Sequence, residues 1–215
     1  MTTVTRMAES TDRLNHSGNV ALLNEPAIGI CGSRDADEQA IELARRFGEM
    51  AADSGLVVVS GNARGVDDAA QLGALAAGGR VVSVLAEGLA GWRPRARYRD
   101  LITGTNYLAL SEFPDDAKWQ AWRAMQRNGT IVRLSRALVV VQSGEKGGTW
   151  EAGIECLRQG KPLLVVQRQE HPETEGNALL VRKGGVPVST IRDLRGLLCR
   201  VTKGEPLAGE QKPLL

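Results

Sequence analysis

Residues 57–70 read Val-Val-Val-Ser-Gly-Asn-Ala-Arg-Gly-Val-Asp-Asp-Ala-Ala, which predicts a buried strand, a glycine-bearing turn and a helix in direct succession. Three consecutive valines suit a strand that is covered on both faces, as in a parallel sheet. Gly61 and Gly65 allow positive φ or a close approach to a ligand, and the helix would direct its free N–H groups toward an anion. Arg64 adds a planar fork of donors that suits phosphate oxygens. We favour a phosphate-contacting loop over an ordinary strand-to-helix turn.

Strands and helices alternate on both sides of this segment. Short apolar runs predict strands at 27–31, 57–59, 81–85, 107–110, 137–141, 163–166 and 186–188. Helical patterns follow over 40–51, 66–77, 116–134, 149–158, 177–183 and 190–198. This alternation predicts an α/β fold of the extended Rossmann-like kind, an open and mainly parallel sheet with helices on both faces. We place this domain at residues 25–202, after a flexible N-terminal arm over 1–24 and before a disordered tail over 203–215.

The composition indicates a protein of the cell interior. The 215-residue chain has 27 lysines and arginines against 25 acidic residues, so its net charge of +2 argues neither for nor against nucleic acid. Cys31, Cys156 and Cys199 lack metal-ligand spacing, and the first two fall in apolar patterns typical of reduced core thiols. No apolar run approaches the length of a membrane span. We therefore expect a soluble, cytoplasmic protein with no metal, no cofactor and no membrane contact.

Three predicted turns should meet at one edge of the sheet, because ligands of open α/β sheets lie beyond the carboxyl ends of the strands. These turns are 32–34 (Gly-Ser-Arg), 61–65 (Gly-Asn-Ala-Arg-Gly) and 144–149 (Gly-Glu-Lys-Gly-Gly-Thr). Each turn combines glycine with a polar side chain, and the repetition is a stronger signal than one such loop. None has the Walker or the Gly-x-Gly-x-x-Gly spacing, which disfavours ATP hydrolysis and dinucleotide chemistry.

Five motifs resemble those of the DprA/Smf DNA-processing family. They are Gly32-Ser33-Arg34, the segment 60–70, Ser111-Glu112-Phe113-Pro114, Arg127-Asn128 and Gly176-Asn177, in the order and rough spacing of the family over residues 27–188. The resemblance implies an extended Rossmann-like domain that binds single-stranded DNA, usually as a dimer, and helps to load a RecA-type recombinase during transformation. It also implies that Arg34 and Arg64 line the phosphate-binding pocket.

The chain departs from the family pattern at several positions. Gln71 stands where the family usually has histidine, and Gly129 replaces the second arginine of Arg-Asn-Arg. The loop that normally ends in Thr-Ala reads Gly-Gly-Thr-Trp-Glu-Ala over 147–152. We find no counterpart of the additional helical and winged domains of many members, so we expect a reduced, DprA-like domain.

Two segments also resemble the LOG-type phosphoribohydrolases, relatives in the same superfamily: 125–127 (Met-Gln-Arg) and 148–151 (Gly-Thr-Trp-Glu). Those enzymes cleave the N-glycosidic bond of nucleoside 5′-monophosphates with an arginine and a glutamate, which the resemblance places at Arg127 and Glu151. A carboxylate can stabilise an oxocarbenium-like transition state while an arginine holds the substrate. A carboxylate in the first turn of a helix is also favourable by about 0.3–1 kcal/mol, and we favour that helix-terminal role for Glu151.

Aromatic and arginine side chains outside the turns have two interpretations each. Trp119 and Trp122 could stack on bases, although their helical spacing favours packing in the core or in a dimer interface. Four arginines alternate over residues 93–99 and either follow a nucleic-acid backbone or form a solvated loop. Asp67 favours the start of a helix and could also contact a ribose hydroxyl.

We predict a binding protein rather than an enzyme: a DprA-like, single-stranded DNA-binding protein of the DNA-processing, transformation or recombination-mediator type. The resemblance implies a homodimer and a RecA-type recombinase as partners. The candidate residues for DNA or nucleotide phosphate are Gly32, Ser33, Arg34, Ser60, Gly61, Asn62, Arg64, Gly65, Asp67, Arg127, Asn128, Gly147, Gly148 and Thr149. The alternative is a LOG-type nucleoside 5′-monophosphate phosphoribohydrolase or a nucleotide-sensing domain, with Arg127 and Glu151 as catalytic residues.

Overall fold

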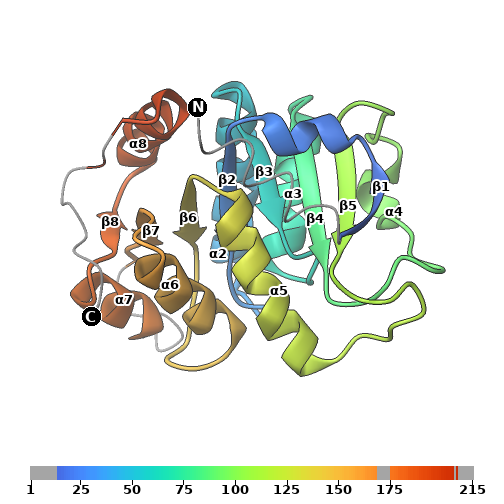
Figure 1. Cartoon of the computed structure of the whole chain (residues 1–215). Helices are drawn as coiled ribbons and strands as arrows, with labels where there is room; N and C mark the ends of the chain where they lie inside the picture. Colours follow the sequence, from blue (N-terminus) through green and yellow to red (C-terminus); the bar gives the residue numbers. More distant parts are fainter. Residues whose placement is uncertain (1–13, 169–174, 206, 208–215) are drawn as a thin grey trace, which may run out of the picture.

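The computed structural model describes residues 14–168, 175–205 and 207, which form one open sheet with helices on both faces (Figure 1). The strands are β1 (Asn15–Gly18), β2 (Ala27–Cys31), β3 (Val57–Ser60), β4 (Arg80–Leu85), β5 (Tyr107–Ser111), β6 (Ala137–Val140), β7 (Leu163–Val166) and β8 (Val186–Val188). The helices are the 3-10 helix η1 (Val20–Asn24), α2 (Glu38–Asp53), α3 (Val66–Ala76), α4 (Ala96–Arg99), α5 (Ala121–Leu134), α6 (Gly148–Arg158), α7 (Glu175–Arg182) and α8 (Ile191–Lys203).

The order of the strands reverses at one point in the sheet. The order is β1-β5-β4-β3-β2-β6-β7-β8, and all neighbours are parallel except β1, which is antiparallel to β5. The chain therefore extends from β2 toward β5 on one side and from β6 toward β8 on the other. Cys31 pairs with Val140, so β2 and β6 end side by side at the reversal. The predicted extended Rossmann-like fold is confirmed, and its switch point is where such sheets bind ligands.

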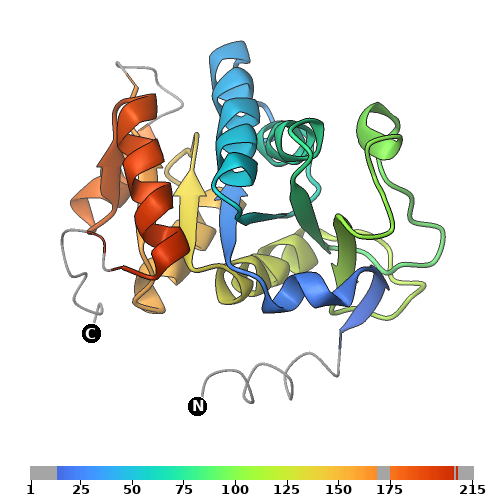
Figure 2. The same ribbon diagram turned by 90° about the horizontal axis from the view of Figure 1, so that it is seen from above.

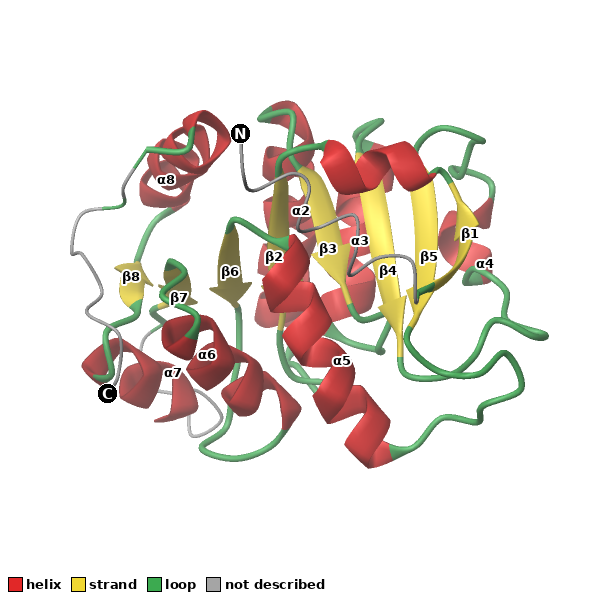
Figure 3. Cartoon of the chain, in the orientation of Figure 1, coloured by secondary structure: helices red, strands yellow, loops and turns green. Residues whose placement is uncertain are grey.

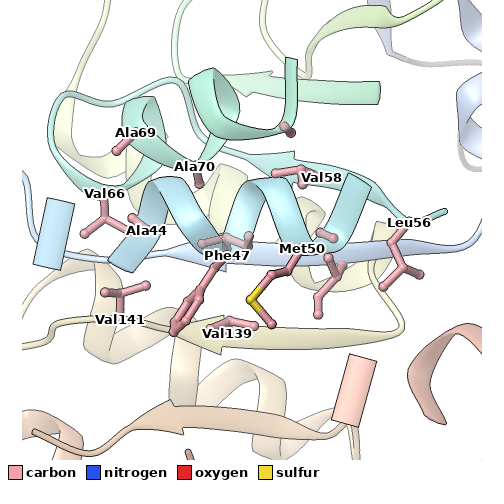
Figure 4. Close-up of a cluster of buried hydrophobic side chains, with 14 of the residues drawn as sticks. Ala44, Phe47, Met50, Leu56, Val58, Val66, Ala69, Ala70, Val139 and Val141 are labelled. Carbon is pink, nitrogen blue, oxygen red and sulfur yellow. The ribbon is translucent and has the colours of Figure 1, made fainter. Parts of the chain in front are cut away.

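Two layers of helices cover the sheet, as the view along the strands shows (Figure 2). Helices α2 and α3 lie on one face and α5 and α6 on the other, and Figure 3 separates these helices from the strands by colour. Every residue of β2, β3, β5, β6 and β7 is buried, which explains why these strands read as continuous apolar runs. In one half of the core, Phe47 and Met50 of α2 pack over Val58 and Val139 (Figure 4).

The expected flexible arm over 1–24 is wrong for residues 15–24, while residues 1–13 lie outside the described part. Strand β1 pairs with β5, and η1 follows it with the buried Leu22 as its anchor. All four residues of β1 are exposed, so the strand carries no apolar alternation that sequence analysis could detect. Its order comes from the backbone ladder to a segment more than ninety residues away along the chain.

The start of α5 and the end of α8 also differ from the expectations. The helix expected over 116–134 begins at Ala121, so Trp119 lies in the preceding loop. Helix α8 continues beyond the expected end at residue 198 to Lys203, where Gly204 in the left-handed region ends it. Most of the expected disordered tail, residues 206 and 208–215, is outside the described part. Among the helices of the described residues, none is long and apolar enough to cross a bilayer.

Candidate functional site

A cavity of about 430 Å³ lies at the switch point between β2 and β6. The turn after β2, the segment that precedes and begins α5, and the turn between β6 and α6 supply most of its wall. Its lining residues are Cys31, Gly32, Ser33, Arg34, Ala63, Asp67, Trp119, Ala121, Ala124, Met125, Arg127, Asn128, Gln142, Ser143, Gly144, Lys146, Gly147, Gly148 and Thr149. The predicted turns 32–34 and 144–149 therefore meet, whereas the turn at 61–65 contributes only Ala63.

Arg127 and Asp67 form a buried ion pair at the inner end of the cavity. Arg127 reaches inward from α5 and Asp67 from the first turn of α3, with 3.6 Å between Nη1 and Oδ2. Burial lowers the pKa of the Arg127 guanidinium, although the carboxylate of Asp67 opposes this shift. Burial likewise raises the pKa of Asp67, against the charge of Arg127 and the amides of Ala63 and Gly61. Two charged side chains with little access to solvent thus lie at the inner end of the cavity.

Asp67 also occupies the turn that the sequence marks as a phosphate loop. Its Oδ2 accepts hydrogen bonds from the backbone N–H groups of Gly61 at 3.1 Å and Ala63 at 3.4 Å. A carboxylate from the chain itself therefore fills the position where we expected an external anion. The helix-start role of Asp67 is compatible with this contact, because the carboxylate sits in the first turn of α3.

The glycine at position 61 makes room for the buried arginine. A Cβ atom there would lie 1.3 Å from Nη1 of Arg127 and 1.8 Å from its Cζ. Gly65 has a different role: it directly precedes α3 with φ near 82°, and a Cβ there would lie 2.4 Å from the carbonyl oxygen of Ser33. Both glycines thus serve close approaches within the protein, one to a side chain and one to the backbone of the neighbouring turn.

The two arginines that the resemblance places in the pocket have separate surroundings. Arg34 lines the cavity and lies over the ring of Trp119, with 4.9 Å between its Cζ and the ring centroid. Arg64 is exposed, is absent from the lining, and forms a 2.5 Å ion pair with Asp35. The neighbouring turns place both residues near the same rim, but only the Arg34 side chain enters the cavity wall.

The N-terminus of α6 opens directly onto the cavity. Gly147 precedes the helix with φ near 96°, and within the described residues no side chain caps this end. Gly148 and Thr149 line the cavity beside it, as does the exposed Lys146. Asn128 positions the helix start by donating from Nδ2 to the carbonyl oxygen of Gly148 at 2.8 Å. Free N–H groups, the positive end of the helix dipole and an ammonium group favour an anion here.

Glu151 lies on the first turn of α6, exposed and outside the cavity lining. The catalytic pair of the alternative would need Glu151 and Arg127 to share a substrate. Arg127 lines the cavity and Glu151 does not, so the two side chains do not face one common site. The geometry supports the helix-terminal role of Glu151.

Two predicted phosphate ligands have structural partners. The Ser60 hydroxyl donates to the carbonyl oxygen of Ile30 at 2.8 Å, deep between two strands. Asn62, with φ near 55°, turns its side chain away from the cavity and accepts from the buried Tyr98 hydroxyl at 2.8 Å. The arginine-rich segment 93–99 also has a structural use, because Arg95 and Arg97 both pair with Asp68 of α3. Sequence analysis missed this link, since the partners lie more than twenty-five residues apart.

Exposed apolar side chains flank the mouth of the cavity. Trp119, Trp122 and Met125 have 48%, 54% and 50% of their surface exposed, so the expectation of core packing is wrong for both tryptophans. Trp119 and Met125 line the cavity itself. Arg123 lies over the rings of Trp122 and Phe113, which holds Trp122 at this surface. We call Trp119 and Trp122 the aromatic rim of the cavity.

Sequence reasoning missed the polar residues that follow β6. Gln142 accepts a 2.9 Å hydrogen bond through its carbonyl oxygen from the N–H of Ser33, which ties two of the lining turns together. Asn177 of α7 accepts from the N–H of Ser143 and donates to the carbonyl oxygens of Val141 and Val166. Asn177 thereby shapes the cavity wall from behind. Only its place in the Gly176-Asn177 motif indicated that it mattered.

Comparison with known proteins shows the family. The family model described as "DNA recombination-mediator protein A" matches residues 2–198. The chain belongs to this family. Within it, the chain is 29% identical to DNA processing protein DprA of Bacillus subtilis over 181 residues, covering 82% of this chain and 61% of that protein. It is 29% identical to DprA of Streptococcus pneumoniae over 155 residues, covering 71% of this chain and 54% of that protein. This family member thus spans less than two thirds of the length of either relative.

Solved structures of the family share the fold. The crystal structure of DprA from Streptococcus pneumoniae superposes with a TM-score of 0.76 at 26% identity, over 85% of this chain and 65% of that one. A structure of DNA processing protein A from Helicobacter pylori gives a TM-score of 0.77 at 26% identity, over 87% and 86% of the two chains. The latter work concerns the single-stranded DNA binding mode of the Helicobacter protein. The family and the Rossmann-like fold expected from the motifs are therefore confirmed.

Proposed function

We propose that this DprA family member binds single-stranded DNA, with phosphate held in the cavity at the switch point and bases against the exposed aromatic rim. One observation carries the proposal. The cavity gathers Arg34, Lys146 and the uncapped start of α6 directly beside the exposed ring of Trp119. Cations with free backbone amides suit phosphate, and an exposed indole suits an unpaired base.

The arrangement of charge and aromatic surface supports a single strand over a duplex. An aromatic platform is worth about 1–3 kcal/mol per stacked base, and only an unpaired strand offers its bases to such a surface. Trp119 and Trp122 are half-exposed, and arginines over both rings keep them at the surface. The similarity to the Helicobacter protein, whose structure concerns single-stranded DNA, supports the same ligand class.

Fluorescence anisotropy with a labelled oligothymidylate tests this function. We expect Arg34→Gln to weaken binding about tenfold, because it removes a cation from the cavity wall. Arg93→Gln is the matched control, since Arg93 is also exposed but lies outside the lining. Both changes remove one surface charge, so equal losses would indicate non-specific electrostatics. Failure of the unmodified protein to bind would refute the proposal.

Salt and aromatic substitutions refine the test. The logarithm of affinity should fall with the logarithm of salt concentration, with a slope of about −0.7 for each phosphate engaged. Trp119→Ala should weaken binding without changing that slope, because stacking releases no counterions. Arg64→Ala should have a smaller effect than Arg34→Gln, since Arg64 already has Asp35 as its partner.

The partners expected from the resemblance stay predictions. Light scattering on the purified chain tests the homodimer, and retention of a RecA-type recombinase on the immobilised chain tests that partner. If Trp122→Ala abolishes dimers but leaves DNA affinity unchanged, this tryptophan belongs to a dimer interface rather than to the DNA surface.

A further inference from the structure

The guanidinium group of Arg127 lacks a full set of partners. The residue is 4% exposed, and within the described part of the chain its Nε has no hydrogen-bond partner. Its ion pair with Asp67 spans 3.6 Å, which is too long for a well-formed hydrogen bond. A buried cation with unmade hydrogen bonds is costly, and a bound anion would supply the missing acceptors.

Asp67 cannot be that anion alone, because its Oδ2 is shared. The same oxygen accepts from the N–H groups of Gly61 and Ala63. The carboxylate is therefore held on the side of the α3 turn. Arg127 also lines the cavity, as do Gly148 and Thr149 of α6.

The cavity has a buried inner end and an exposed rim. Cys31, Asp67 and Arg127 are buried lining residues, whereas Arg34 and Lys146 are exposed ones. A ligand that reaches Arg127 must enter from the rim and stop at this inner end. An internal phosphate could reach the inner end only if the strand ran into the cavity and out again. A terminal phosphate can reach it with the strand entering once. The volume of about 430 Å³ suits one nucleotide-sized group.

The charge of the lining matches a dianion. Arg34, Arg127 and Lys146 carry three positive charges, and Asp67 carries one negative charge. The wall thus has an excess of two positive charges. An internal phosphodiester carries a single negative charge, whereas a phosphate monoester carries about −1.5 to −2 at pH 7.

We propose that the inner end of the cavity is a site for a phosphate monoester, the 5′-terminal phosphate of a DNA strand or the phosphate of a free nucleoside monophosphate. The inference rests on the proposed DNA-binding function and adds which part of the strand enters. Arg127 and Arg34 would contact the phosphate oxygens, together with the amides of Gly148 and Thr149. The remaining nucleotides would follow the aromatic rim.

Anisotropy competition with three strands of equal sequence and length tests this site: a 5′-phosphorylated, a 5′-hydroxyl and a circularised ten-nucleotide strand. We expect the phosphorylated strand to bind about tenfold more tightly than the hydroxyl strand, and the circle to bind no better than the hydroxyl strand. A nucleoside 5′-monophosphate should displace the phosphorylated strand, and the parent nucleoside should not.

Lys146→Gln should reduce the preference for the phosphorylated strand, whereas Lys118→Gln should leave it intact. Both lysines are exposed, so neither change threatens the fold, and Lys118 lies outside the lining. Arg127→Lys keeps the buried charge but removes the planar fork, and it should lower the preference most. Thermal unfolding of each variant confirms that it is folded, and the lysine pair decides the matter if Arg127→Lys does not fold.

The outcomes separate this inference from the function on which it rests. Equal affinity for all three strands would overturn the monoester site and leave the DNA-binding function standing. Binding of the mononucleotide without binding of any strand would support the site and overturn the DNA-binding function. No binding of any probe would overturn both.

Discussion

Replacing Gly61 by alanine should destabilise the protein through Arg127. The built Cβ lies 1.3 Å from Nη1 and 1.8 Å from Cζ of that arginine, so the guanidinium has to leave its place. The backbone does not resist the change, because Gly61 is outside the positive-φ region. Overpacking costs about 1–3 kcal/mol, and a buried ion pair that loses one partner costs about 3–5 kcal/mol. Because Arg127 moves rather than disappears, we expect a loss of about 2–4 kcal/mol.

Urea unfolding followed by tryptophan fluorescence measures this loss as a lower midpoint at unchanged slope. Gly129→Ala is the matched control, since a Cβ at this position in α5 has no neighbour within 4 Å. It should instead stabilise the protein by about 0.5–1 kcal/mol, the usual gain from replacing glycine inside a helix. The same two glycine-to-alanine changes thus have opposite expected signs.

A double-mutant cycle identifies the cause. In an Arg127→Met background the clashing guanidinium is absent, so Gly61→Ala should cost much less than in the unmodified chain. Equal costs in both backgrounds would refute the claim that the arginine is what position 61 accommodates. A neutral Gly61→Ala would refute it as well.

Three further outcomes follow from buried polar groups. With a thiol reagent at pH 8, the exposed Cys199 should react quickly, while Cys31 and Cys156 should react only on unfolding, because burial raises the pKa of both thiols, that of Cys156 to about 12. Lys161→Met should lower the free energy of unfolding by about 2 kcal/mol in urea titrations, because the Lys161 ammonium donates to three carbonyl oxygens at the end of α5. Burial raises the pKa of Asp68 above 3.8, so the native state holds more protons than the unfolded chain just above that pH. The free energy of unfolding should therefore fall as the pH rises through the native pKa of Asp68. Asp68→Asn should flatten this part of the measured profile of stability against pH.

Local sequence pattern was sufficient to predict the parallel strands of the sheet and the edge at which the cavity lies. Valine runs such as 57–59 belong to strands that are covered on both faces. Because every residue of such a strand is buried, the strand is visible in the sequence as a continuous apolar run. The turns that contain Gly32 and Gly147 follow such strands. Because the carboxyl ends of parallel strands lie at the same edge of a sheet, the sequence predicted that these turns meet, and both line the cavity. The edge strand β1 has no such run, because a backbone ladder holds it and all its residues are exposed.

The sequence by itself determined the alternation of strands and helices, the family and the edge at which anions are expected, because those depend on burial periodicity and on residues close together in the chain. Only the tertiary structure decided which groups face the cavity. Asp67 accepts a hydrogen bond from a backbone amide of the turn that precedes α3, and Arg64 pairs with Asp35. Arg127 extends from α5 to the inner end of the cavity, where it pairs with Asp67. In each case several charged groups could pair with the same partner. Which pair forms depends on distances between residues far apart in the chain, and only the fold sets these distances.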